Sequence, residues 1–146
     1  MPSVIQELSD EDVALNRDHV VERVEDWKRR ISHLYDEIVS WFPDLRSDRD
    51  DTVEMFEALM HATGVAPSAL PVLRLHDSNG QVAKFIPKGL WIIGSNGLMI
   101  LFSGKGQYVI ADRSDYFAAP RWEISSSSDR LRSEPLSRTT LGHAIR

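Results

Sequence analysis

The sequence contains no cysteine, which excludes disulfide bonds, thiolate metal sites and cysteine nucleophiles. No apolar stretch approaches the roughly 18 residues that a membrane-spanning helix requires. Residues 1–12, MPSVIQELSDED, are acidic and lack the apolar segment of a signal peptide. We therefore expect a cytoplasmic protein that does not enter a membrane.

Motifs typical of cofactor and metal sites are missing as well. Lys105 lies between two glycines, whereas a phosphate-binding P-loop has Ser or Thr after its lysine and then a helix. The histidines form no H-x-x-x-H or H-E-x-x-H pair, and the acidic residues near the predicted strand ends show no metal-binding pattern. We therefore predict neither a cofactor nor a metal ion.

The two halves of the chain differ in charge. The 146 residues, of which 42% are hydrophobic and 27% charged, are typical of one soluble globular domain. Residues 1–70 contain 7 basic and 16 acidic residues, whereas residues 71–146 contain 10 basic and 6 acidic residues. The simplest interpretation is that two parts of the domain pack together through complementary surfaces. The alternative is that a mildly basic sheet meets an anionic partner.

One long helix is predicted near the start of the sequence. Ser9 is a typical N-cap, acidic residues follow it, and neither glycine nor proline occurs between it and Pro43. Apolar residues recur at alternating spacings of four and three, which predicts a heptad seam: Val20, Val24, Trp27, Ile31, Leu34, Ile38 and Trp41. A helix of about 30 residues is roughly 45 Å long, more than a compact domain of this size spans. We therefore expect it to project or to pair with a second copy, and we predict a homodimer that associates through Val20, Val24, Trp27 and Ile31.

A second, shorter helix is predicted to fold back on the first. Residues 44–51, DLRSDRDD, form a charged connection, and Thr52–Thr63 carries apolar residues on one face before Gly64. The helical part of the domain would thus comprise residues 8–64, as a long helix and a helical hairpin.

From Val72 onward the apolar pattern changes to a period of two, which predicts antiparallel strands over residues 72–125. Asn79-Gly80 and Asn96-Gly97 are typical of two-residue hairpin turns. With further strands at Gln107–Ala111 and Arg121–Ile124, they predict a meander of five to six strands. The predicted fold is therefore α+β, with the helices packed on an antiparallel sheet in a single domain, residues 1–146.

The segment Leu90–Phe102 is predicted to be the central hairpin, with its turn at Asn96-Gly97. Both of its faces would be apolar, and both would need cover. The helices can cover one face, and the C-terminal segment or a second subunit must cover the other. Residues 126–146 form a polar tail whose composition permits a short helix at Thr139–Ile145.

Two function classes remain, and the first is a non-catalytic protein–protein interaction module, such as an adaptor, a regulator or an immunity- or antitoxin-like partner. Its acidic helical surface would suit a protein partner with a basic surface. The loop that leads into the last predicted strand, together with the start of that strand, holds residue types that are enriched at interfaces: Tyr116, Phe117, Arg121 and Trp122. The alternative role of this loop is to fix the sheet edge to the long helix.

The second class is a small metal-free ribonuclease or nucleic-acid-binding protein that uses the basic β half. His76 would accept a proton from the 2′-hydroxyl, and nearby cations would hold the phosphate: Arg74, Lys84 and Lys88. We do not favour nucleic acid as a partner, because the basic residues are scattered along the sequence rather than clustered.

Overall fold

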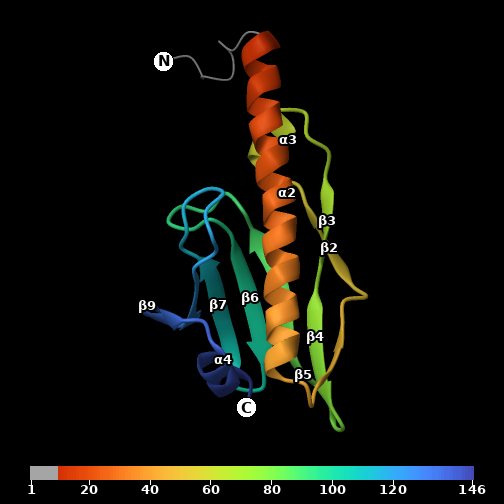
Figure 1. Cartoon of the computed structure of the whole chain (residues 1–146), viewed down its shortest axis with the longest axis vertical. Helices are drawn as coiled ribbons and strands as arrows, with labels where there is room; N and C mark the ends of the chain where they lie inside the picture. Colours follow the sequence, from red (N-terminus) through yellow and green to blue (C-terminus); the bar gives the residue numbers. More distant parts are fainter. Residues whose placement is uncertain (1–9) are drawn as a thin grey trace.

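The structure is a computed structural model that describes residues 10–146, with side chains from residue 16 onward. The predicted cap Ser9 lies outside the described residues. The long helix α2 (Asp10–Trp41) contains 32 residues, close to the predicted length. Its N-terminal turns extend beyond the sheet, as expected from the length argument (Figure 1). Among the described helices, none combines the length and apolar character needed to cross a membrane.

A seven-stranded antiparallel sheet forms the second layer, so the predicted α+β fold with an antiparallel sheet is confirmed. Its strands lie in the spatial order β1 (Arg46–Asp48), β4 (Leu73–Asp77), β5 (Gly80–Gly89), β6 (Leu98–Ser103), β7 (Gly106–Asp112), β8 (Trp122–Ser126) and β9 (Asp129–Pro135). Two further strands, β2 (Thr52–Met55) and β3 (Ser68–Pro71), form a separate two-stranded ribbon beside α2 (Figure 1).

The heptad seam of α2 packs on the chain's own sheet. Four seam residues are fully buried in the central cluster: Val20, Val24, Trp27 and Ile31. The seam pattern therefore reports intramolecular packing, and a dimer through these side chains would have to expose the core. Formation of a homodimer stays a prediction, but it requires another surface.

The predicted helical hairpin is wrong. Residues 52–55 form β2, because they pair with Ser68–Pro71 in register Thr52↔Pro71 to Met55↔Ser68. The helix α3 (Ala58–Ala62) is a short remnant of the predicted Thr52–Thr63 helix. The charged segment before it, expected to be a loop, contains β1, which pairs with β4 at the sheet edge. Cross-strand pairing to distant residues has overridden the local pattern.

The predicted hairpin at Asn96-Gly97 is also wrong. β6 pairs with β5, in register Pro87↔Met99, so residues 90–97 form a long connection outside the sheet. Gly97 has φ 117°, and a Cβ there would overlap the ring of Trp27. This glycine is therefore required by a close approach between loop and helix rather than by a two-residue turn.

The first hairpin is confirmed, with a shift in register. β4 and β5 are joined at Asp77↔Gly80, and a bulge follows Leu75. As a result, Ala83 and Phe85 are buried, whereas Val82 and Ile86 are only partly buried. A bulge inserts one residue and so exchanges the faces of the strand beyond it.

The C-terminal segment is a docked helix, α4 (Arg138–Ile145), capped by Ser137 through the backbone N–H of Thr140. Its apolar residues join the same core cluster as α2: Leu141, Ala144 and Ile145. The helix α4 therefore covers the same face of the seven-stranded sheet as α2 does, and it does not cover the other face of the sheet. The opposite face carries Ile86 and Ile100, which are partly exposed and do not belong to that cluster.

Candidate functional site

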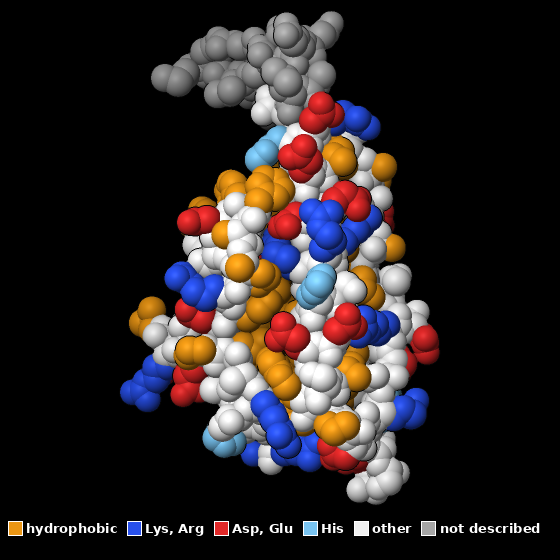
Figure 2. Space-filling model, viewed as in Figure 1, with side chains coloured by type: hydrophobic (Ala, Val, Ile, Leu, Met, Phe, Trp, Pro, Cys, Tyr) orange, Lys and Arg blue, Asp and Glu red, His pale blue; other side chains and the backbone are white. Residues whose placement is uncertain are grey.

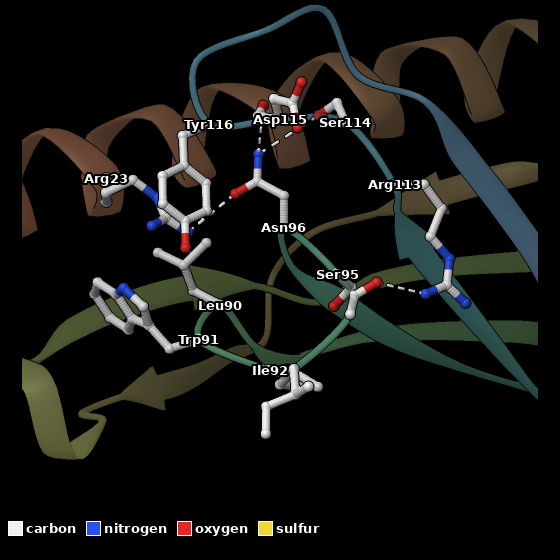
Figure 3. Close-up of a pocket in the computed structure, with 12 residues that line it drawn as sticks. Arg23, Leu90, Trp91, Ile92, Ser95, Asn96, Arg113, Ser114, Asp115 and Tyr116 are labelled. Carbon is white, nitrogen blue, oxygen red and sulfur yellow. Dashed lines mark hydrogen bonds between the residues drawn. The ribbon is translucent and has the colours of Figure 1, made fainter.

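Two concave regions lie on either side of the loop formed by residues 113–121. The first, which we name the arginine cavity, has a volume of about 730 Å³ and is lined by Arg23, residues 90–96 and residues 113–116 (Figure 3). The second, which we name the tryptophan groove, has a volume of about 460 Å³ and lies beside α2. Both regions bring α2 together with loops at one end of the sheet.

Arg23 forms the polar wall of the arginine cavity. It is 2% exposed, and its Nη2 donates a hydrogen bond to Asn96 Oδ1 at 3.0 Å. The guanidinium lies 3.6 Å from the centre of the Tyr116 ring and 5.6 Å from that of Trp91. Its Nε is buried without a hydrogen-bond partner. Among the described side chains, no carboxylate forms an ion pair with Arg23.

Asn96 holds this arrangement in place. Its side chain is buried, and its Nδ2 donates to the backbone oxygen of Asp115 at 3.2 Å. This bond orients the amide so that its Oδ1 faces Arg23, as Figure 3 shows. The residue therefore connects the 90–97 loop, the 113–121 loop and α2 through a single amide.

Arg30, one heptad further along α2, is also buried but differs in its partners. Its Nη1 donates to Asp112 Oδ2 at 2.8 Å and to the backbone oxygen of Asn96 at 2.6 Å. Its Nε donates to Asp26 at 2.7 Å, while its Nη2 has no partner in the protein. The other oxygen of Asp112 accepts the backbone N–H groups of Ser114 and Arg121. Two carboxylates thus compensate the charge of Arg30.

The tryptophan groove is an apolar depression flanked by polar residues of α2. Its apolar lining comes from α2, the 113–121 loop, β8 and the segment before α4: Leu34, Trp41, Ala118, Pro120, Trp122 and Leu136. Figure 2 shows hydrophobic side chains gathered in this furrow beside the helix. Trp41, Trp122 and Leu136 are each partly exposed, and the Trp122 ring lies 6.1 Å from that of Trp27.

The predicted interface loop contributes to both regions. Tyr116 and Phe117 remain 58% and 48% exposed, yet their rings lie 6.4 Å and 6.0 Å from that of His19 on α2. Phe117 has φ 60°, a conformation that non-glycine residues rarely adopt. Trp122 lines the groove, and Arg121 Nη2 donates to the backbone oxygen of Arg113. The loop therefore contacts the helix and still exposes two aromatic rings.

The structure brings together three of the four candidate ribonuclease residues. Arg74 lies opposite Lys84, and His76 follows two residues along the same strand, while Lys88 lies further along β5. His76 Nε2 lies 2.7 Å from Asp48, and this hydrogen bond lowers the pKa of the Asp48 carboxyl. Arg74 forms an ion pair with Asp51. Arg74 and His76 thus both have acidic partners, which weakens the attraction of this face for phosphates.

Sequence reasoning did not identify Arg23, Asn96 or Arg30 as site residues. A signal was present, because Arg23 and Arg30 are spaced by seven and each directly precedes a seam residue. Within the described side chains, no group of His, Asp or Glu is arranged to hold a metal ion.

The chain matches no protein-family model, no curated protein and no solved structure.

Proposed function

We propose that the protein is a non-catalytic protein–protein interaction module. In this proposal, the tryptophan groove binds an amphipathic segment of a partner protein that carries basic residues on its flanks. The observation that supports it is the pair of partly exposed tryptophans, Trp41 and Trp122, in one concave apolar surface. Tryptophan is strongly enriched among residues that dominate binding energy, especially in pockets that exclude water.

The charge of the helix surface supports a basic partner. Two of the basic residues of α2, Arg23 and Arg30, are buried and do not contribute to its surface. The acidic side chains along the same part of the helix stay exposed: Asp18, Glu22, Glu25, Asp36 and Glu37. At the groove itself, Glu37 and Asp26 are accompanied by Arg29, so the acidic character belongs to the helix surface as a whole. Basic flanks on the bound segment would therefore speed its association and orient it.

The edges of the sheet are less suited than the tryptophan groove to binding a partner, which would have to add a strand there. The edge strand β9 is exposed along its whole length, but it carries charged residues of both signs and ends at Pro135. Charged residues and proline are the features that protect an edge from pairing. The opposite edge, β1, has three residues and offers little backbone for pairing.

Site-specific photocrosslinking in the producing cells tests the proposal. A photoreactive amino acid replaces Glu37 at the groove or, as a control, the exposed Gln81 on the distant β4–β5 hairpin. We expect position 37 to give a defined crosslinked partner with a basic apolar segment, and position 81 to give none. The purified partner should then bind roughly tenfold more weakly to Glu37→Lys, because the substitution reverses a charge at the groove.

The matched control is Glu54→Lys, which makes the same charge change at an exposed position on β2. This variant should bind the partner as tightly as the wild type. Equal binding to Glu37→Lys and wild type would contradict the proposal. A crosslink from position 37 to a second copy of this chain would also overturn it, because the groove would then be a surface for self-association.

A further inference from the structure

We propose that the arginine cavity binds a carboxylate joined to an apolar or aromatic group, with Arg23 as its anchor. This site is distinct from the tryptophan groove and does not depend on the function proposed for it. Three features of the cavity support this ligand: Arg23 has no carboxylate partner among the described side chains, the net charge that faces the cavity is positive, and apolar residues lie beside the guanidinium.

Arg23 is a buried cation whose charge the protein leaves without a carboxylate. Its Nη2 donates to the neutral amide oxygen of Asn96, and the guanidinium also lies over the rings of Tyr116 and Trp91. Aromatic faces attract a cation but accept no strong hydrogen bond from it. A guanidinium has five N–H donors that match the two oxygens of a carboxylate, so the group is suited to an anion from outside the chain.

The charges around the cavity favour a single negative charge on the ligand. Besides Arg23, the lining contains Arg113 and Asp115. Arg113 has its guanidinium 3.7 Å from Glu123, which partly compensates it, and it also donates to the Gly94 carbonyl. Asp115 would repel a second negative charge. A carboxylate therefore fits the cavity better than a doubly charged phosphate.

The remainder of the lining is suited to an apolar group. Leu90, Trp91 and Ile92 lie along one side, and the Tyr116 ring covers the guanidinium on the other (Figure 3). Binding pockets for small molecules commonly combine such apolar walls with a few fixed polar groups. Asn96 and Arg23 are fixed here by their mutual bond and by burial, so the anchor requires little reorganisation on binding.

Calorimetric titration with phenylacetate tests the proposal on the full chain. We expect saturable binding of phenylacetate, no binding of the uncharged phenylacetamide, and weaker binding of inorganic phosphate. A short peptide that ends in phenylalanine with a free carboxylate, compared with its amidated form, distinguishes a peptide terminus from a small acid as the source of the same group. Absence of binding by both carboxylates would overturn the proposal, as would equal binding of phenylacetamide.

The affinity of variants for phenylacetate tests whether Arg23 is the anchor. Arg23→Met should weaken binding at least about tenfold, because the charge-assisted hydrogen bonds are lost. The matched control Arg29→Met removes an exposed arginine from the same helix and should bind as the wild type does. Tyr116→Ala changes a largely exposed ring and leaves the core intact, and it should weaken binding severalfold. Unchanged affinity in both Arg23→Met and Tyr116→Ala would overturn the assignment.

Discussion

Arg23 and Arg30 occupy equivalent heptad positions on α2, and both are buried, but their surroundings differ. Arg30 contacts two carboxylates and the backbone of Asn96, so it ties the helix to the end of the sheet. Arg23 contacts one amide and two aromatic rings at the wall of a cavity. Both arginines are buried to a similar extent. Arg30 thus has a structural role, whereas the described side chains leave the charge of Arg23 without a carboxylate.

The difference follows from the cost of burying a charge. A buried ion is tolerated when carboxylates and hydrogen bonds compensate it, and removal of one partner then leaves the other uncompensated. Arg30 meets this condition within the chain. Arg23 has no carboxylate partner within the described part of the chain, and we infer that a carboxylate from a bound ligand compensates its charge.

The largest expected effect is that of Arg30→Met. This substitution leaves the carboxylate of Asp112 buried without its cation, and Asp26 loses the same partner. We expect the free energy of unfolding to fall by about 3–5 kcal/mol. Denaturant titration followed by circular dichroism measures the change. A loss below about 1 kcal/mol would contradict the structural role of Arg30.

The same substitution at Arg23 should cost much less. Arg23→Met leaves no carboxylate uncompensated and replaces the guanidinium with an apolar chain beside aromatic rings. We expect a loss of about 1 kcal/mol, mainly from the unpaired Oδ1 of Asn96. The same titration measures it, and equal costs at Arg23 and Arg30 would remove the distinction between the two sites.

A smaller effect is expected at Asp48, whose partly buried hydrogen bond with His76 can be compared with the buried contacts of Arg30. The hydrogen bond from His76 lowers the pKa of the Asp48 carboxyl below its ordinary value of 3.8. Stability from this bond is therefore fully present above that value and is lost as the pH falls through the lowered one. Asp48→Asn should lower the melting temperature slightly near neutral pH.

Thermal unfolding of wild type and Asp48→Asn across a pH series checks this prediction. The difference between the two proteins should begin to shrink as the pH falls below 3.8, where the carboxyl of the unfolded chain is protonated. It should disappear once the pH has passed the lowered pKa of the folded wild type. A difference that grows on acidification would show that the sign of the pKa shift is wrong.

The sequence predicted those parts of the fold that depend on local periodicity. The length of α2, the apolar seam along it, the turn at Asn79 and the C-terminal helix all follow from spacing and capping within a few residues. The seam was expected to associate with a second copy, however, and it packs on the chain's own sheet. The α+β class follows from the change of period near Val72. These features could be predicted because neighbouring residues determine them.

The remaining features depend on contacts between distant residues. Residues 52–55 form a strand because of a partner segment after α3, and no local pattern specifies that pairing. Asn96-Gly97 fits a hairpin turn locally, but Asn96 is buried against Arg23, 73 residues away, and Gly97 lies against Trp27. The arginine cavity was missed for the same reason, since three separate segments build it.

The most direct test of the central claim follows the side-chain Nε–H resonances of both arginines by nuclear magnetic resonance during a phenylacetate titration. We predict that the Arg23 resonance shifts in a saturable manner while that of Arg30 stays unchanged, because Arg30 already has its two carboxylates. If the Arg23 resonance does not respond, or if both resonances respond equally, Arg23 is not the anchor of a binding site.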